Sequence, residues 1–304
     1  MELATPITIY WDLPAPPGDS AFLRRVAADI AACRPLMLQV TAGNHPVDGV
    51  LPELLEQLGG KGIAVTLTIP AAVFEGALPL PIGVKEVLLA VERLDDIRGQ
   101  ENSLTGSTGM AVAVCAGNWR KLPAIVAYCR ERGIRRLVLP MQRLYGGEPP
   151  FFLTGEEQRE LAAALAAAGG VAGMELTIHD PFLWRAFNPG VPFPQGGCQA
   201  ANTMIAIAPD GGVYPCPTLP LRLGEIGSAS LREIVASAAK REVRRRLLEA
   251  PAACEECGEL AECRGGCRGR AYVMQGSLEG ADPACRQGVS SPAGFDKSSH
   301  RYAQ

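Results

Sequence analysis

Seven of the chain's ten cysteines fall in its last third, and this crowding constrains the fold more than any other feature of the sequence. A reducing cytosol disfavours structural disulfides, which leaves burial, catalysis or metal binding as roles for these thiols. Thiolates are soft ligands, and short spacings such as that between Cys254 and Cys257 let neighbouring sulfurs reach one metal centre. Seven ligands are too many for one tetrahedral zinc ion but suit two centres, one with four thiolates and one with three. We therefore expect two iron–sulfur clusters, with structural zinc, disulfides or inert thiols as the alternatives.

Composition limits the remaining classes of function. The 304 residues are enough for one large or two modest domains. Hydrophobic residues make up 47% and the formal net charge is -3, which argues against a basic nucleic-acid-binding protein. The longest apolar stretches, such as 162–168, are much shorter than a membrane-spanning helix. Residues 1–11 lack the basic start and apolar run of a secretory signal, so we expect a cytoplasmic protein that binds neither membranes nor nucleic acid.

The first two-thirds of the chain alternate between short apolar runs and helical patterns, which is typical of βα units around a parallel sheet. Asp19 can cap the first helix, Pro52 can open the second, and Thr154 with Glu157 has the spacing of a capping box. Six or seven such units predict an α/β fold with a partial (βα)6-type barrel, and a doubly wound sheet is the alternative. The predicted strands are 7–11, 36–41, 63–69, 86–91, 110–115, 134–140 and 174–179.

Polar residues follow these strands and could line the mouth of a barrel, where ligands bind in such folds. Chains also reach the surface at these points, so plain loop or capping roles are the competing interpretation, above all for His45 and His179. The residues are Asp12, Asn44, His45, Glu92, Asn118, Gln142, Arg143, His179 and Asp180.

Other prominent residues receive structural interpretations. We interpret the three upstream cysteines as small core hydrophobes, and three aromatic residues as core or interface packing. The basic stretch 240–246 is predicted to occupy the solvated face of one helix over about 230–249. The cysteines are Cys33, Cys115 and Cys129, and the aromatic residues are Trp11, Trp184 and Tyr214.

A stretch rich in proline, glycine and aromatic residues, 180–195, marks a predicted boundary between a barrel over 1–190 and a smaller domain over 191–304. In the smaller domain, an apolar run and the turn Pro209-Asp210-Gly211-Gly212 predict a β-hairpin with Cys198 and Cys216 near its open ends. Such a hairpin would bring the two thiolates towards one point.

The whole cysteine arrangement carries a family resemblance. The pattern Cys-x12-Gly-x4-Cys, then Cys-x2-Cys-x5-Cys-x3-Cys, then a final Cys, resembles the SPASM domain that follows the barrel in many radical SAM peptide-modifying enzymes. The hairpin sequence 205–217, the segment Leu223-Gly224-Glu225-Ile226 and the loop Cys263-Arg264-Gly265-Gly266-Cys267 are also similar to that family.

The resemblance, strong over 196–288, implies two auxiliary 4Fe-4S clusters. It implies an inner cluster with an open site or a non-cysteine ligand, because no further cysteine lies between Cys129 and Cys198. The implied inner ligands are Cys198, Cys216 and Cys267, and the implied outer ligands are Cys254, Cys257, Cys263 and Cys285.

One motif of the family is missing. Radical SAM enzymes carry Cys-x3-Cys-x2-Cys after the first strand, where three thiolates leave one iron free to chelate S-adenosylmethionine. The corresponding loop here, 12–19, holds no cysteine, and the family's Gly-Gly-Glu-Pro stretch is replaced by Ala42-Gly43-Asn44-His45-Pro46. We therefore expect no binding or cleavage of S-adenosylmethionine by this chain alone.

Within the family, the chain is similar to the SPASM domain proteins of GeoRSP systems, whose barrel is degenerate. Such proteins accompany an active radical SAM/SPASM enzyme and a small carrier-like peptide chaperone. The resemblance implies a non-catalytic partner that relays electrons or binds a ribosomal peptide substrate. Two other hypotheses stay open: a metal-stapled interaction module without a redox role, and an enzyme acting at the inner cluster or near His45, His179 and Asp180.

Overall fold

The computed structural model describes residues 3–15, 19–43, 49–73, 82–97, 108–194 and 197–285. Its first seven strands are parallel, and each pairs with the next in chain order. They match the seven predicted strands, and the differences are confined to their ends. The strands are β1 (Thr8–Asp12), β2 (Met37–Thr41), β3 (Ala64–Pro70), β4 (Val84–Ala90), β5 (Thr108–Ala111), β6 (Arg136–Leu139) and β7 (Glu175–Ile178).

The described helices surround and complete this sheet. Four of them follow strands of the barrel: α1 (Ser20–Cys33), α2 (Leu51–Gly60), α3 (Leu122–Glu131) and α4 (Gly155–Ala167). The later helices are α5 (Pro181–Phe187), α6 (Leu231–Val235), α7 (Ala238–Leu248), α8 (Leu260–Cys263) and α9 (Arg268–Gln275). Short 3-10 turns are η1 (Ala71–Val73), η2 (Leu94–Ile97), η4 (Trp119–Lys121) and η5 (Ala252–Cys254).

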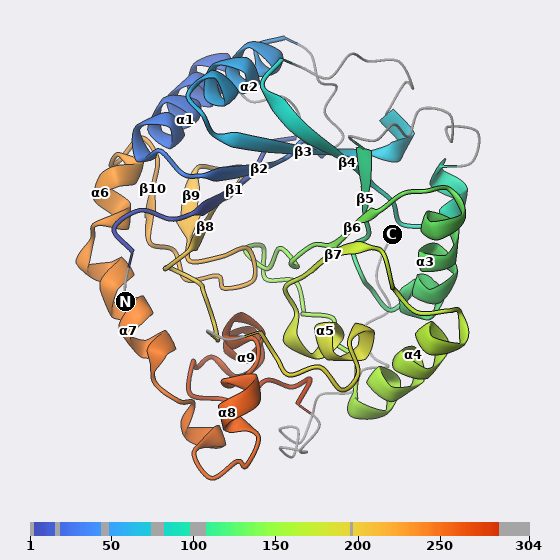
Figure 1. Ribbon diagram of the computed structural model, residues 1–304. Helices are drawn as coiled ribbons and strands as arrows, with labels where there is room; N and C mark the ends of the chain where they lie inside the picture. Colours follow the sequence, from blue (N-terminus) through green and yellow to red (C-terminus); the bar gives the residue numbers. More distant parts are fainter. Residues whose placement is uncertain are drawn as a thin grey trace.

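Figure 1 shows the strands as an arc with α1 to α4 on its outer side, while α5, α8 and α9 lie at its open side. Because α1 to α4 cover one face only, the sheet is a partial barrel and not a doubly wound sheet. The predicted α/β fold and barrel are thus confirmed.

The hairpin that follows extends the same sheet. Strands β8 (Met204–Ile207) and β9 (Gly212–Tyr214) pair antiparallel, as predicted, and Gly211 takes φ +82° in the turn between them. Strand β8 also pairs parallel with β1, and Ile205 lies beside Ile9. With β10 (Gly224–Glu225) at the edge, one ten-stranded sheet runs in the order β10-β9-β8-β1-β2-β3-β4-β5-β6-β7.

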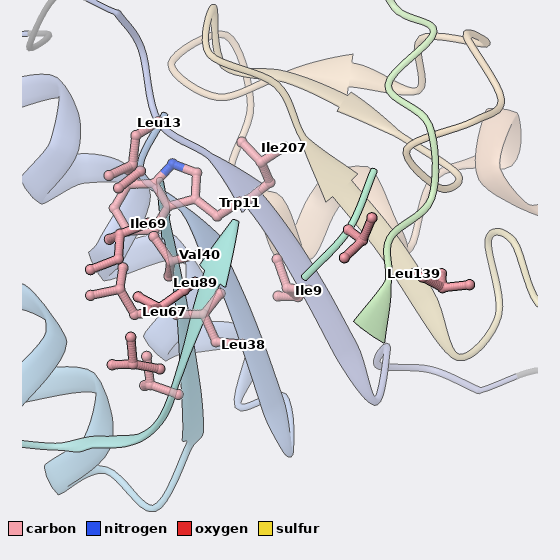
Figure 2. Close-up of a cluster of buried hydrophobic side chains, with 14 of the residues drawn as sticks. Ile9, Trp11, Leu13, Leu38, Val40, Leu67, Ile69, Leu89, Leu139 and Ile207 are labelled. Atoms are coloured by element: carbon pink, nitrogen blue, oxygen red, sulfur yellow. The ribbon is translucent and has the colours of Figure 1, made fainter. Parts of the chain in front are cut away.

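Side-chain alternation along β1 separates the core from the barrel interior. Ile9 and Trp11 are fully buried and pack with the inner faces of the helices, for example with Val26 and Ile30 of α1. Figure 2 shows Ile9 and Trp11 with neighbouring side chains of the same core. The intervening Tyr10 packs instead against the β8–β9 hairpin. The outward-facing residues therefore form the hydrophobic core with the helices, and the inward-facing residues line the barrel interior.

Local sequence features start the helices as predicted. The Asp19 carboxylate accepts the N–H of Ala21 at 3.0 Å, and Thr154 and Glu157 form the reciprocal capping box of α4. The single helix expected over 230–249 is wrong. The chain forms α6 and α7 instead, because the Ser237 hydroxyl accepts the N–H of Lys240 at 3.1 Å and starts a second helix.

The upstream cysteines follow the core interpretation in two cases of three. Cys33 and Cys129 are buried, and burial raises their thiol pKa values to about 11 and about 12. Cys115 is exposed, which corrects its assignment to the core: β5 ends at Ala111, and Cys115 lies in the loop beyond it. Among the described residues, no helix combines the length and apolar character needed to cross a bilayer.

Candidate metal centre

Three cysteines meet where the hairpin and α9 come together. Cys198 precedes β8, Cys216 follows β9, and Cys267 is the N-cap residue of α9. The N–H of Ala201 donates to the carbonyl of Pro215 at 2.9 Å, which ties the chain beside Cys198 to the chain beside Cys216. All three border a cavity of about 300 Å³. The structure thus brings together the inner set that the sequence resemblance implies.

Backbone N–H groups point at the sulfurs of this set. The N–H of Arg270 donates to Cys267 Sγ at 3.4 Å, and the backbone N–H groups of Thr218 and Leu219 act to lower the pKa of Cys216. Burial, followed by the charges of Cys198 and Cys267, raises the pKa of Cys216 well above its usual range. Burial also raises the pKa of Cys267, to about 12. Ionised sulfurs here need a nearby positive charge, which a bound metal centre supplies.

The other four cysteines form a second set around the loop after α7. Burial raises the pKa of Cys254, and the charges of Cys263, Cys285 and Cys257 raise it further, in that order. Cys254, Cys257 and Cys285 border one cavity, whereas Cys263 borders the cavity of the inner set. These are the four implied outer ligands, and three of them lie close enough to Cys254 for their charges to act on its thiol.

Both sets suit a cluster with several irons. In the part of the chain that the structure describes, no three or more His, Cys, Asp or Glu side chains form a group that could hold a metal ion. The cysteines stand around cavities instead, as a cluster requires, because its irons and sulfides lie between the thiolates. Soft sulfur donors, burial and backbone N–H groups directed at sulfur all fit iron–sulfur chemistry.

Buried basic residues brace the inner set. Arg244 Nη1 donates to the carbonyl of Cys198 at 2.6 Å, and both Lys240 and Arg244 are buried. The predicted solvated face is therefore wrong for these two residues, although Arg245 is exposed and pairs with Glu242 and Glu249. The four-residue spacing of Lys240 and Arg244 places them on one face of α7. Arg244 supports the backbone beside a cysteine, which is a structural role that we did not predict.

A buried ion-pair group links the barrel to the cysteine loops. Arg270 bridges Asp282 and Asp180, and Asp180 also caps α5 through the N–H groups of Phe182 and Leu183. Burial raises the pKa of Asp180, but Arg270 and these N–H groups outweigh it and lower the pKa overall. Asp180 was predicted as a polar residue at the end of a strand and, in one hypothesis, as part of an active site.

The barrel mouth holds a second buried ion pair. Asp12 accepts from Arg143 Nη2 at 2.9 Å and from the Tyr145 hydroxyl at 2.7 Å, and Arg143 Nη2 also donates to Thr41 at 3.0 Å. Nearby, the Tyr10 hydroxyl lies 3.2 Å from His179 Nε2. Asp12, Arg143 and their partners therefore occupy the end of β1.

The other predicted mouth residues serve the backbone or lie elsewhere. Asn118 accepts the N–H of Cys115 and donates to the carbonyl of Ala113, while Gln142 holds the backbone of Phe151 through both of its amide atoms. Glu92 is exposed. His179 borders the cavity of the inner set. Asn44 and His45 lie outside the described residues.

Comparisons with known proteins agree with this site. The SPASM model, an iron-sulfur cluster-binding domain, matches residues 198–258. The mycofactocin maturase MftC of Mycolicibacterium smegmatis is 30% identical over 146 residues, which are 46% of this chain and 36% of that protein. MftC of Mycobacterium tuberculosis is 32% identical over 101 residues, 32% of this chain and 25% of that protein. The matched region thus spans about a third or less of these curated relatives.

Two solved structures share the fold. Streptococcus suis SuiB superposes with a TM-score of 0.64 at 15% identity, covering 94% of this chain and 78% of its own. A structure of anSMEcpe with bound AdoMet and a peptide gives a TM-score of 0.62 at 13% identity, covering 91% and 93%. At these identities the likeness concerns the fold alone.

The fold and the cysteine sets define a class of protein in which an iron–sulfur domain follows a βα barrel. Residues 198–258 of this chain match the SPASM iron-sulfur cluster-binding domain, and the chain is similar to radical SAM/SPASM proteins in sequence over part of its length and in fold.

Proposed function

We propose that this chain is a non-catalytic iron–sulfur partner of an active radical SAM peptide-modifying enzyme. In this proposal it holds two 4Fe-4S clusters, does not cleave S-adenosylmethionine, and either relays electrons or binds the peptide substrate. The observation that carries the proposal is a contrast within one chain: all seven SPASM cysteines line two cavities, whereas the loop after β1 has no cysteine.

The Asp12 ion pair supports the loss of the catalytic site. Asp12 is the last residue of β1, and the family's catalytic cysteines follow this strand. Its carboxylate is already engaged by Arg143 and Tyr145, which reach across the mouth from the segment after β6. Positive charge, aromatic bulk and hydrogen bonds therefore surround the end of β1, the strand that the catalytic cysteines of the family follow.

The proposed ligand sets follow the family resemblance. Cys198, Cys216 and Cys267 would hold the inner cluster, and its remaining position would face the cavity that His179 also borders. Cys254, Cys257, Cys263 and Cys285 would hold the outer cluster. When bound, the clusters would supply one-electron chemistry and an iron able to accept a ligand, while residues of this chain position the sulfurs and exclude water. We retain 1–190 as the barrel and 191–304 as the SPASM domain.

Peptide modification is the proposed context for three reasons. The relatives named above are maturases, one of the fold neighbours is a structure with a bound peptide, and the cavity beside the inner set has aromatic walls that include Phe151, Phe182 and Trp184. Such walls suit the side chains of a polypeptide. The proposed partners are an active radical SAM/SPASM enzyme, a small carrier-like peptide chaperone and a ribosomal peptide, all in the cytoplasm.

Two other functions make different predictions. A metal-stapled interaction module would use the centres only to hold the cysteine loops together, as the crossing of Cys267 to the hairpin cysteines suggests. An enzyme acting at the inner centre would need the cavity residues His179 and Asp180. Asp180 is committed to Arg270 and to capping α5, which favours a structural role for it.

The test combines this chain with a radical SAM/SPASM enzyme from the same organism. Incubated alone with dithionite and S-adenosylmethionine, the iron-loaded chain should form no 5'-deoxyadenosine. Added to the enzyme and its peptide, it should raise the rate of peptide modification, and Cys216→Ser should abolish the increase. An unchanged increase with Cys216→Ser would favour the interaction module, and 5'-deoxyadenosine from the chain alone would refute the proposal.

A further inference from the structure

A group of three charges, two of them buried, lies against the inner cysteines, and the proposed function does not use it. Arg270 Nε and Nη2 donate to the two carboxylate oxygens of Asp282 at 2.7 and 2.8 Å, and Nη1 donates to Asp180. The side chains of Arg270 and Asp282 are only 2% and 1% exposed. We call Arg270, Asp180 and Asp282 the Arg270 group.

The Arg270 group contacts one proposed ligand of each centre. Asp282 Oδ2 accepts the backbone N–H of Cys267 at 2.6 Å, and the N–H of Arg270 donates to Cys267 Sγ at 3.4 Å. The carbonyl of Asp282 accepts the N–H of Cys285 at 2.9 Å. Asp282 therefore touches the backbone of an inner cysteine through its carboxylate and that of an outer cysteine through its main chain.

The approach of Asp282 depends on a glycine. A Cβ on Gly266 would lie 2.6 Å from Asp282 Oδ2, and Gly266 has φ +67°, which side chains rarely adopt. The turn before Cys267 is thus shaped to admit the carboxylate. The other carboxylate, Asp180, pairs with Arg270 and caps α5.

We infer that Asp282 is a positioning residue that sets the reduction potential of the centre held by Cys198, Cys216 and Cys267. This inference rests on the proposed function, since it needs the inner cluster. The potential of an iron–sulfur centre follows its net charge, its hydrogen bonds and its exposure to solvent. A buried carboxylate is weakly screened, so it acts on the centre through its charge as well as through the Cys267 backbone.

The experiment compares carboxylate-to-amide variants of the reconstituted full chain. Asp282→Asn removes one negative charge but keeps an oxygen that can accept the N–H of Cys267. Loss of negative charge favours the reduced state, so the potential of the inner centre should shift to a more positive value. Glu279→Gln is the matched control, because Glu279 lies three residues earlier, is 41% exposed and pairs with Arg246 at 3.6 Å. It should leave the potential unchanged.

Redox titration followed by EPR separates the outcomes. Asp180→Asn provides a second test if Asp282→Asn fails to fold, and it should shift the inner potential in the same direction by less. If Asp282→Asn and Asp180→Asn both load two centres and their inner potentials equal that of Glu279→Gln, this inference is overturned and the proposed function is not. A wild-type chain that loads no inner centre, seen first in its iron content, would overturn both the two-cluster proposal and this inference.

Discussion

Replacing Asp12 by alanine tests whether the barrel mouth depends on its buried ion pair. The substitution leaves the Arg143 guanidinium without its carboxylate and removes the acceptor of the Tyr145 hydroxyl. Asp12 and Arg143 have side chains that are 9% and 29% exposed, so the pair is mostly but not fully desolvated. Breaking a fully buried pair costs about 3–5 kcal/mol, and the partial exposure of Arg143 lowers our expectation to roughly 2–3 kcal/mol.

This loss can be measured as a melting temperature. At about 2–4 °C per kcal/mol for a chain of this size class, Asp12→Ala should lower Tm by roughly 4–12 °C. Arg143→Met combined with Asp12→Ala should recover part of the loss, because no buried charge is then left unpaired. Glu53→Gln is the control, since its pair with Arg24 is about half exposed and should matter little. Equal Tm values for Asp12→Ala and Glu53→Gln would refute the reasoning.

Three further outcomes are expected. Gly269→Ala should reduce the iron bound by the inner set, because the added Cβ would lie 2.5 Å from the Thr218 carbonyl oxygen. Gly258→Ala is the control, since its Cβ would have no atom within 4 Å. Iron analysis of both variants tests this expectation. Partial desolvation, then Arg143 and Arg136, lowers the pKa of His179, which is exposed to solvent, so below about pH 6.5 the unfolded chain takes up a proton more readily and stability falls slightly. His179→Gln should therefore lose less Tm than wild type between pH 7.5 and 5.5, and equal losses would contradict this. Cys216→Ser should lower the iron content while Cys33→Ser, a buried helical residue, leaves it unchanged.

The barrel was predictable because its signals are local. Strands buried in a parallel sheet leave continuous apolar runs, as 87–91 does, and capping residues mark helix starts, as Asp19 does. The cysteine spacing was equally informative, since seven closely spaced thiolates favour metal binding over other roles. The grouping into two sets depended on the family resemblance, because spacing alone leaves several pairings open.

Contacts between distant segments left no comparable signal. The pairing of β8 with β1, the Asp12–Arg143 pair, 131 residues apart, and the Asp180–Arg270 pair depend on how the barrel closes onto the cysteine loops. Lys240 and Arg244 were assigned to solvent by their charge, although tertiary packing buried them. Only the split at Ser237 had a local signal, a serine followed by helix-forming residues.

The most direct test of the account is the metal content of the chain after anaerobic purification and reconstitution. Iron, sulfide and zinc are counted per chain, and Mössbauer and EPR spectra are recorded before and after reduction. The account predicts about eight irons in two 4Fe-4S environments, one with a distinguishable iron site. About twelve irons would contradict the degenerate barrel, and one or two zinc ions with negligible iron would contradict both clusters.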